Sequence, residues 1–219
     1  MDFQKVKAAI FDLDGTLLDT LEDLKDATNA ALAHFGCPQR SLAEIRSFVG
    51  NGARNQIRLS LPGKPDDPEL DTILGWYKEY YSAHCQIKTA PYEGILEALA
   101  DIQRDHPVAI VSNKPDVAVK CLSALHFPGV FALGESADCP RKPAPDMVFK
   151  AMEAIGGEKC IYVGDSEVDI RTAKNAGVPC ISVLWGFRDR DVLEGEGGRY
   201  FCVDPGSLRA VIGEVCHGE

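Results

Sequence analysis

The chain has 219 residues, which is enough for one large domain or for a domain with a smaller insert. Hydrophobic residues make up 45% and charged residues 26%, the balance of an ordinary globular protein. The formal net charge of −10 argues against a nucleic acid or an anionic membrane surface as a partner.

The N-terminal segment lacks the long apolar run and cleavage site of a secretory signal. The longest near-apolar run, VPCISVLWGF, is far too short to span a bilayer. The 8 cysteines are spread almost evenly and form no C-x-x-C pair, so we expect free thiols rather than disulfides or a zinc site. We therefore expect a soluble protein of the cytoplasm.

Apolar runs of strand-forming residues recur along the chain. They cover Val6–Phe11, Pro107–Ser112, Cys160–Gly164 and Val178–Leu184. Because these runs hardly alternate, they suit strands that are covered on both faces, as in a parallel sheet. Helical patterns at 115–127, 145–156 and 166–177 separate the last three runs. This order predicts an α/β protein with a doubly wound parallel sheet.

A long helical stretch interrupts this alternation of strands and helices between the first two predicted strands. From Leu18 to Thr89 the sequence shows helical patterns and no convincing strand. A crossover between parallel strands normally needs only one helix, so an insert of this length predicts a small cap domain. We expect a core of residues 1–17 and 90–219 and a helical cap of residues 18–89. Trp76, Tyr77, Tyr80 and Tyr81 fall at helical spacing and are interpreted as the core of this cap.

The first strand ends in two aspartates. Asp12 and Asp14 lie two positions apart and so point to the same side of an extended chain. Each carboxylate makes the other harder to ionise unless a cation lies between them. Gly15 then allows a sharp turn. The pair of aspartates indicates a bound metal ion, a protonated carboxyl group, or both.

Polar residues also follow the later strands. They are Ser112 and Asn113 after the second run, Lys142 in a proline-stiffened loop, and Asp165 and Asp169 after the third run. Each has an ordinary explanation as a turn, cap or surface residue. In a doubly wound fold, however, the carboxyl ends of the strands meet at one site. Three converging carboxylates, from Asp12, Asp14 and Asp165, then predict a hard divalent cation such as Mg²⁺.

These segments resemble a known superfamily. FDLDGTLLDT, VSNK, RKPAPD and GDSEVDI, in that order, are similar to the four motifs of the haloacid dehalogenase superfamily. The helical insert after the first motif resembles the α-helical cap of that superfamily, and its core is a Rossmann-like sheet. LLDT, VGNGAR, APYEG and GDSEVDI are similar to the phosphoglycolate phosphatases among its members.

The resemblance implies a phosphatase of a small phosphorylated metabolite, acting as a monomer or a homodimer. Asp12 would be the nucleophile that forms an aspartyl-phosphate, and Asp14 the general acid and base. Asp12, the backbone carbonyl of Asp14, and Asp165 would hold Mg²⁺. Ser112 and Lys142 would bind the phosphoryl oxygens, with Thr16 and Asn113 also at the substrate. Asp169 would orient Lys142 or a water bound to the metal.

The cap contains one candidate receptor for the rest of the substrate. Gly50 and Gly52 bracket Asn51 at a predicted helix start, and Arg54 lies in the next turn. A helix N-terminus with a nearby arginine can bind a carboxylate. Gly52 and Arg54 are therefore candidates for binding the acid group of 2-phosphoglycolate.

Other activities of this superfamily stay open at this point. Sugar phosphates and nucleotides are alternative substrates, and a sugar phosphomutase similar to β-phosphoglucomutase is an alternative enzyme. Thr16 favours hydrolysis, because such mutases usually carry a bulkier or β-branched apolar residue there. Asp14 argues against a hydrolase of carbon–halogen bonds, which typically lacks this second aspartate. GNGARN does not match the G-x-G-x-x-G pattern of nucleotide-binding dehydrogenases.

Overall fold

The computed structural model describes residues 8–63 and 68–217. A 6-stranded sheet forms the centre of the larger part of the molecule, in the order β5-β4-β1-β6-β7-β8. The strands are β1 (Ala8–Phe11), β4 (Val108–Pro115), β5 (Phe131–Glu135), β6 (Cys160–Gly164), β7 (Cys180–Val183) and β8 (Tyr200–Cys202). All neighbouring strands of this sheet are parallel. The predicted doubly wound α/β fold is confirmed.

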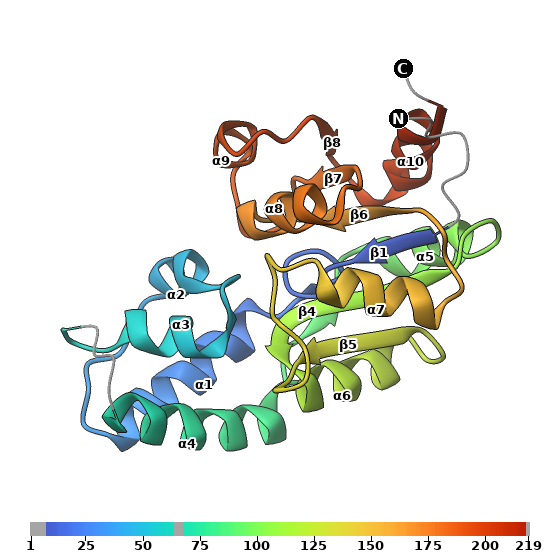
Figure 1. The fold of residues 1–219 in the computed structure, drawn as a ribbon. Helices are drawn as coiled ribbons and strands as arrows, with labels where there is room; N and C mark the ends of the chain where they lie inside the picture. The colour runs from blue at the N-terminus through green and yellow to red at the C-terminus, as the bar shows by residue number, and fades with distance from the viewer. Residues whose placement is uncertain (1–7, 64–67, 218–219) are drawn as a thin grey trace.

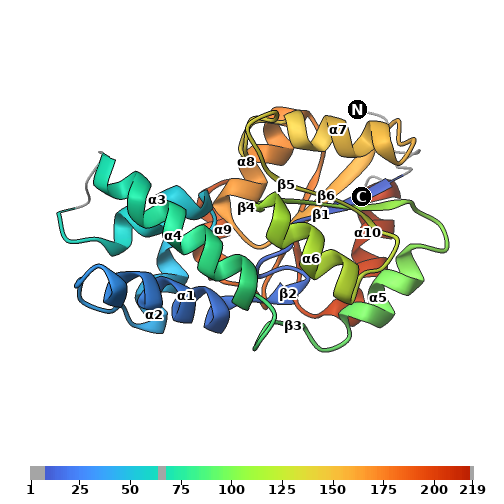
Figure 2. The ribbon, with the colours of Figure 1, turned by 90° about the horizontal axis from the view of Figure 1, so that it is seen from below.

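Helices cover both faces of the sheet (Figure 2). They are α5 (Ile95–Ile102), α6 (Asp116–His126), α7 (Asp146–Ala154), α8 (Glu167–Ala176), α9 (Arg190–Gly195) and α10 (Leu208–His217), with a 3₁₀ turn at Pro205–Ser207. Side chains alternate along β1, so Ile10 packs in one apolar cluster with Met147 of α7. Phe11 packs in the other cluster with Leu99 of α5 and Leu208 of α10.

Four helices form a second body beside the sheet (Figure 1). They are α1 (Leu21–His34), α2 (Leu42–Phe48), α3 (Gly52–Ser60) and α4 (Pro68–His84). Ser41 and Glu44 form a capping box that starts α2. The chain enters this body after β2 (Leu18–Asp19) and leaves it before β3 (Ala90–Pro91), and these two short strands pair antiparallel.

Several elements differ from the sequence-based prediction. The first predicted strand began at Val6, which lies outside the described residues, and β4 runs three residues further than predicted, to Pro115. The expectation that residues 18–89 contain no strand is wrong at Leu18–Asp19. The core also contains β5, β8, α5, α9 and α10, which the sequence patterns did not predict. Among the described residues, no helix combines the length and the apolar composition needed to cross a membrane.

The sheet order determines where polar residues gather. β1 lies between β4 and β6, so the carboxyl ends of these three strands are adjacent. Asp12 and Asp165 directly follow β1 and β6, and Ser112 lies in the last half of β4. The chain reverses its winding direction around β1, and ligands of doubly wound sheets bind at such a point.

Candidate active site

Three buried carboxylates meet at this edge of the sheet. Asp12 follows β1, Asp165 follows β6, and Asp169 lies in the first turn of α8. One oxygen atom from each lies within 4.8 Å of the other two. Their exposed fractions are 6%, 1% and 0%. Charges buried this deeply are stable only when they are paired or bind a metal.

Asp165 lies in a tightly packed position between two glycines. A Cβ atom added to Gly15 would lie 2.3 Å from Asp165 Oδ2, and one added to Gly186 would lie 2.3 Å from Asp165 Cβ. Gly15 also has a φ of +79°, which disfavours any other residue. Oδ2 of Asp165 accepts a hydrogen bond of 2.7 Å from the backbone N–H of Phe187. The loops after β1 and β7 thus hold this carboxylate in place.

Lys142 supplies a positive charge to the cluster. Its Nζ lies 2.9 Å from Asp12 Oδ1 and 2.8 Å from Asp169 Oδ1. Asn113 fixes the lysine's backbone, because its Oδ1 accepts from Lys142 N at 2.8 Å and its Nδ2 donates to Lys142 O at 3.0 Å. Asn113 Nδ2 also donates to Gly50 O, which lies at the start of α3. The side chain of Asn113 therefore positions the lysine loop.

Asp169 is fully engaged by protein donors. Its Oδ1 accepts from Lys142 Nζ and Tyr162 OH, and its Oδ2 accepts from the N–H and hydroxyl of Ser166. A carboxylate has about four lone-pair positions, so little capacity remains for a metal ion. Asp12 and Asp165 have more free capacity and could hold a metal ion.

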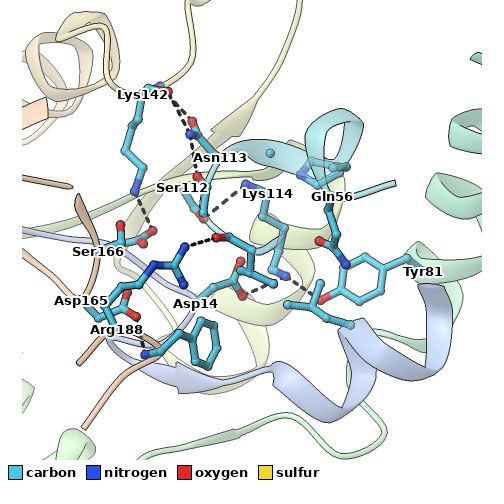
Figure 3. A pocket seen from close by; sticks show the side chains of 18 of the residues that line it. Asp14, Gln56, Tyr81, Ser112, Asn113, Lys114, Lys142, Asp165, Ser166 and Arg188 are labelled. Carbon is cyan, nitrogen blue, oxygen red and sulfur yellow. Dashed lines mark hydrogen bonds and ion pairs between the residues drawn. The ribbon is translucent and has the colours of Figure 1, made fainter. Parts of the chain in front are cut away.

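Asp14 pairs with Lys114, the second buried lysine of the site (Figure 3). Lys114 Nζ lies 2.9 Å from Asp14 Oδ1, and the side chain of Lys114 is only 1% exposed. Lys114 Nζ also donates to Tyr81 OH of α4 at 2.5 Å and lies 4.5 Å from the centre of its ring. Thr20 donates to Asp14 Oδ1 at 2.6 Å. The sequence analysis quoted the VSNK segment but assigned no role to Lys114.

A pocket lies between the sheet edge and the helices α3 and α4. The core contributes Asp12, Asp14, Ser112, Asn113, Lys114, Lys142 and Asp165, and the helical body contributes Gly52, Gln56, Tyr77 and Tyr81. The space between its walls is about 520 Å³ with the open mouth included. A space of this size suits a small molecule.

Three of the predicted site residues do not line this pocket, namely Asp169, which lies against Lys142, Arg54 and Thr16. Arg54 forms an ion pair with Asp71 on the surface, and its side chain is 42% exposed. Thr16 is buried behind the pocket wall, where its hydroxyl lies 3.4 Å from Asp165 Oδ1. Gly52, the other predicted residue of the cap, does line the pocket and has a φ of +81°. The structure thus brings Gly52, but not Arg54, to the sheet edge.

Arg188 connects the loop after β7 to the helical body. It donates to Arg46 O at 2.9 Å and to Val49 O at 2.6 Å, and it forms an ion pair with Glu167 at 2.8 Å. The sequence analysis did not identify this residue. Its partners come from the end of α2 and the start of α8, which are far apart in the sequence, so only the folded arrangement reveals the link.

The electrostatics of the pocket fit a divalent cation. Asp12, Asp14, Asp165 and Asp169 bring four negative charges, and Lys114 and Lys142 bring two positive charges. Burial raises the pKa of Asp12 to about 7, against the effect of Lys142. Burial, followed by the charges of Asp169 and Asp12, raises the pKa of Asp165 well above its ordinary range. A bound Mg²⁺ would offset the two excess negative charges.

The sequence of this chain is similar to those of known proteins. The family model of haloacid dehalogenase-like hydrolases matches residues 9–183. A phosphoglycolate phosphatase of Mesorhizobium japonicum is 35% identical over 196 residues, which cover 85% of this chain and 86% of the relative. A phosphoglycolate phosphatase of Rhodobacter capsulatus is 35% identical over 188 residues, which cover 83% and 85% of the two chains.

The similarity extends to solved structures. A crystal structure from Lactobacillus delbrueckii subsp. bulgaricus, provisionally described as a phosphoglycolate phosphatase, matches with a TM-score of 0.87 and 37% identity. The match covers 98% of this chain and 100% of that chain. The chain therefore belongs to the haloacid dehalogenase-like hydrolases and is a phosphoglycolate phosphatase-like member of that family.

Proposed function

We propose that the protein is a Mg²⁺-dependent phosphatase that hydrolyses 2-phosphoglycolate to glycolate and phosphate. The observation that carries this proposal is the buried contact of Asp12 with Lys142 beside Asp165, in a pocket between the sheet edge and the helices α3 and α4. The curated relatives described above bear the same activity in their names.

In the first half of the reaction, Asp12 attacks the phosphorus atom. A bond forms between Asp12 and phosphorus, and the ester bond to the glycolate oxygen breaks. Asp14 gives its proton to that oxygen. Ser112 and Lys142, which line the same part of the pocket, stabilise the negative charge of the phosphoryl oxygens.

In the second half, water removes the phosphoryl group from Asp12. Asp14, now ionised, takes a proton from the water as its oxygen attacks phosphorus. The bond between phosphorus and Asp12 breaks, which restores both carboxyl groups and releases phosphate. The reaction needs no further reactant: water supplies one oxygen and one proton to phosphate, and its other proton replaces the proton that Asp14 gave to glycolate.

Asp12, Asp165 and the backbone carbonyl of Asp14 would hold Mg²⁺. When bound, the ion would neutralise charge on the phosphoryl oxygens and on the carboxylates around them. Asp169 would keep Lys142 in place, since both are buried and in contact at 2.8 Å.

The helices of residues 18–89 would act as a cap that selects the substrate. Hydrogen bonds of Asn113, Lys114, Arg188 and Arg46 already join this segment to the core. Tyr77 and Tyr81 of this segment line the pocket, so they would contact the part of the substrate beyond the phosphoryl group.

A phosphate-release assay tests this proposal. The purified protein is incubated with Mg²⁺ or with a chelator, and with 2-phosphoglycolate, hexose phosphates or nucleoside monophosphates. We expect release that depends on Mg²⁺ and is fastest with 2-phosphoglycolate. Failure to release phosphate from any monoester would overturn the proposal. Acid quenching during turnover, followed by peptide mass analysis, should find a phosphoryl group on the peptide that contains Asp12.

A further inference from the structure

The pocket contains one buried cation that the phosphoryl chemistry does not use. Lys142 is bound to Asp12 and Asp169 at the phosphoryl end, and Arg188 is bound to Glu167 and to two backbone carbonyls. Lys114 lies at the other side of Asp14, toward the cap. A lysine with a side chain only 1% exposed loses most of its hydration, and it then needs polar partners for its ammonium group.

We propose that Lys114 binds a carboxylate on the leaving group of the substrate, and that Tyr81 of the cap holds the lysine in position for it. This inference rests on the proposed phosphatase activity and deepens it. It makes Lys114 the residue that selects small phosphomonoesters with an acidic leaving group. It also replaces Arg54, which pairs with Asp71 outside the pocket, as the receptor for that group.

The position of Lys114 follows from the position of Asp14. Thr20 and Lys114 both contact Oδ1 of Asp14, and no hydrogen bond among the described residues engages Oδ2. Oδ2 is thus free to reach the leaving oxygen of the ester. The atoms next to that oxygen then lie within a few ångströms of Lys114 Nζ, which is itself 2.9 Å from Asp14.

The ammonium group has a donor available for this contact. Lysine has three N–H donors, and Asp14 and Tyr81 accept two of them. A carboxylate can accept the third without displacing Asp14. The Tyr81 ring, 4.5 Å from Nζ, stabilises the cation and limits its movement. Lys114 is thereby held in one geometry before the substrate binds, which reduces the entropic cost of binding.

The backbone around Lys114 supports this assignment. The pairing of β4 with β5 shifts register between Val111 and Pro115, so the end of β4 does not follow regular strand geometry. Such irregularities redirect side chains next to binding sites. Ser112, Asn113 and Lys114 all line the pocket, although they are consecutive in a strand where neighbours normally point to opposite sides.

A pair of matched substrates tests the inference. 2-Phosphoglycolate and 2-hydroxyethyl phosphate have the same ester and the same chain length, but only the first carries a carboxylate. The measured quantity is the ratio of their kcat/KM values. Any effect of Lys114 on Asp14 applies to both substrates and cancels in this ratio. The variant Lys114→Met removes the charge and keeps much of the side-chain volume.

We expect Lys114→Met to lower the ratio by about 10- to 100-fold, mainly through KM for 2-phosphoglycolate. The control is Lys120→Met, which removes the same charge from an exposed position of α6, where the lysine pairs with Asp116. The control should leave the ratio unchanged. An unchanged ratio in Lys114→Met would overturn the inference.

A second variant covers the case in which Lys114→Met does not fold. Tyr81→Phe keeps the ring and removes only the hydroxyl that contacts Lys114. It should lower the same ratio by about three- to tenfold, as expected for the loss of one hydrogen bond to a charged group. An unchanged ratio would again count against the receptor.

The two proposals fail in different ways. If the wild-type protein with Mg²⁺ hydrolyses neither substrate nor any other monoester, the phosphatase proposal fails. If it hydrolyses both substrates with equal kcat/KM, the phosphatase proposal stands and the carboxylate receptor fails.

Discussion

The two lysines of the pocket are equally buried but differ in what holds them. The side chains of Lys142 and Lys114 are 2% and 1% exposed. All polar partners of Lys142 Nζ, which are Asp12, Tyr162 and Asp169, belong to the core, whereas Lys114 bridges the core and Tyr81 of the cap. The lysine at the proposed phosphoryl end is therefore held within the core. The lysine at the proposed leaving-group end is held jointly by the core and by α4.

This difference separates chemistry from selectivity in one small site. Changes at the phosphoryl end should lower the rate for every substrate, because all substrates share the phosphoryl group. Changes at the leaving-group end should affect substrates according to the group beyond the ester oxygen. The predictions below test this division, together with the substrate pair proposed for Lys114.

Asp12→Asn should have the largest effect. The amide is a poor nucleophile, so kcat should fall by about 10⁴-fold or more for all substrates. The fold should persist, because the variant removes a buried charge without changing the side-chain volume. Phosphate release and circular dichroism measure the two properties. Asp191→Asn, at an exposed carboxylate, serves as the control. A near-native rate in Asp12→Asn would refute the nucleophile assignment.

Asp169→Asn should have the next largest effect. Lys142 loses one of its two carboxylate partners, and the new amide N–H₂ group faces donors from Ser166 or from Lys142 and Tyr162. Breaking a buried ion pair in this way costs about 3 kcal/mol of the free energy of unfolding. Chemical denaturation measures this loss. The ratio of kcat/KM between 2-phosphoglycolate and 2-hydroxyethyl phosphate should stay unchanged. A large change in that ratio would contradict the proposed separation of a phosphoryl end from a leaving-group end.

Metal removal should change the pH dependence of stability. Without metal, burial raises the pKa of Asp12 from 3.8 to about 7 and raises the pKa of Asp165 as well. The folded protein then binds more protons than the unfolded chain in this range, so its stability falls as the pH rises from about 4 through about 7. Mg²⁺ stabilises the ionised carboxylates and should offset the loss.

The measurement is the melting temperature with Mg²⁺ and with a chelator. The increase produced by Mg²⁺ should be several degrees larger at about pH 7.5 than at about pH 5, where protons compete with the ion. Asp165→Asn removes one of the proposed ligands and should reduce this increase at the higher pH. An equal increase at both values of pH would contradict the assignment of the metal to Asp12 and Asp165.

The sequence predicted the central part of the fold well, because β1, β4 and β6 are continuous apolar runs. The helical pattern predicted at 166–177 corresponds to α8, which Gly177 follows with a φ of +71°. β5 was missed because Phe131–Glu135 contains a glycine and ends in a charge. That glycine, Gly134, lies so near the start of α6 that an added Cβ would be 2.4 Å from Asp116 Cα. This requirement comes from packing and leaves no periodic signal.

The site could be predicted to the same extent and for the same reason. Residues near the carboxyl ends of neighbouring strands in one sheet lie close together. The sequence therefore predicted that Asp12, Ser112 and Asp165 would be neighbours. Lys114 and Tyr81 depend on how α4 docks against the end of β4. Tyr81 was interpreted as part of the cap core, and it is buried there, but its hydroxyl also faces the pocket lysine.

Arg54→Ala should have the smallest effect, although the sequence proposed this residue as the carboxylate receptor. Its guanidinium pairs with Asp71 on the exposed side of α3, and exposed ion pairs contribute little to stability or to binding at a distant site. KM for 2-phosphoglycolate should therefore stay within about twofold of the wild-type value. A tenfold rise in KM that spares 2-hydroxyethyl phosphate would mean that α3 reorients when substrate binds. The leaving-group end would then be formed by the cap alone, and Lys114 would lose its role as receptor.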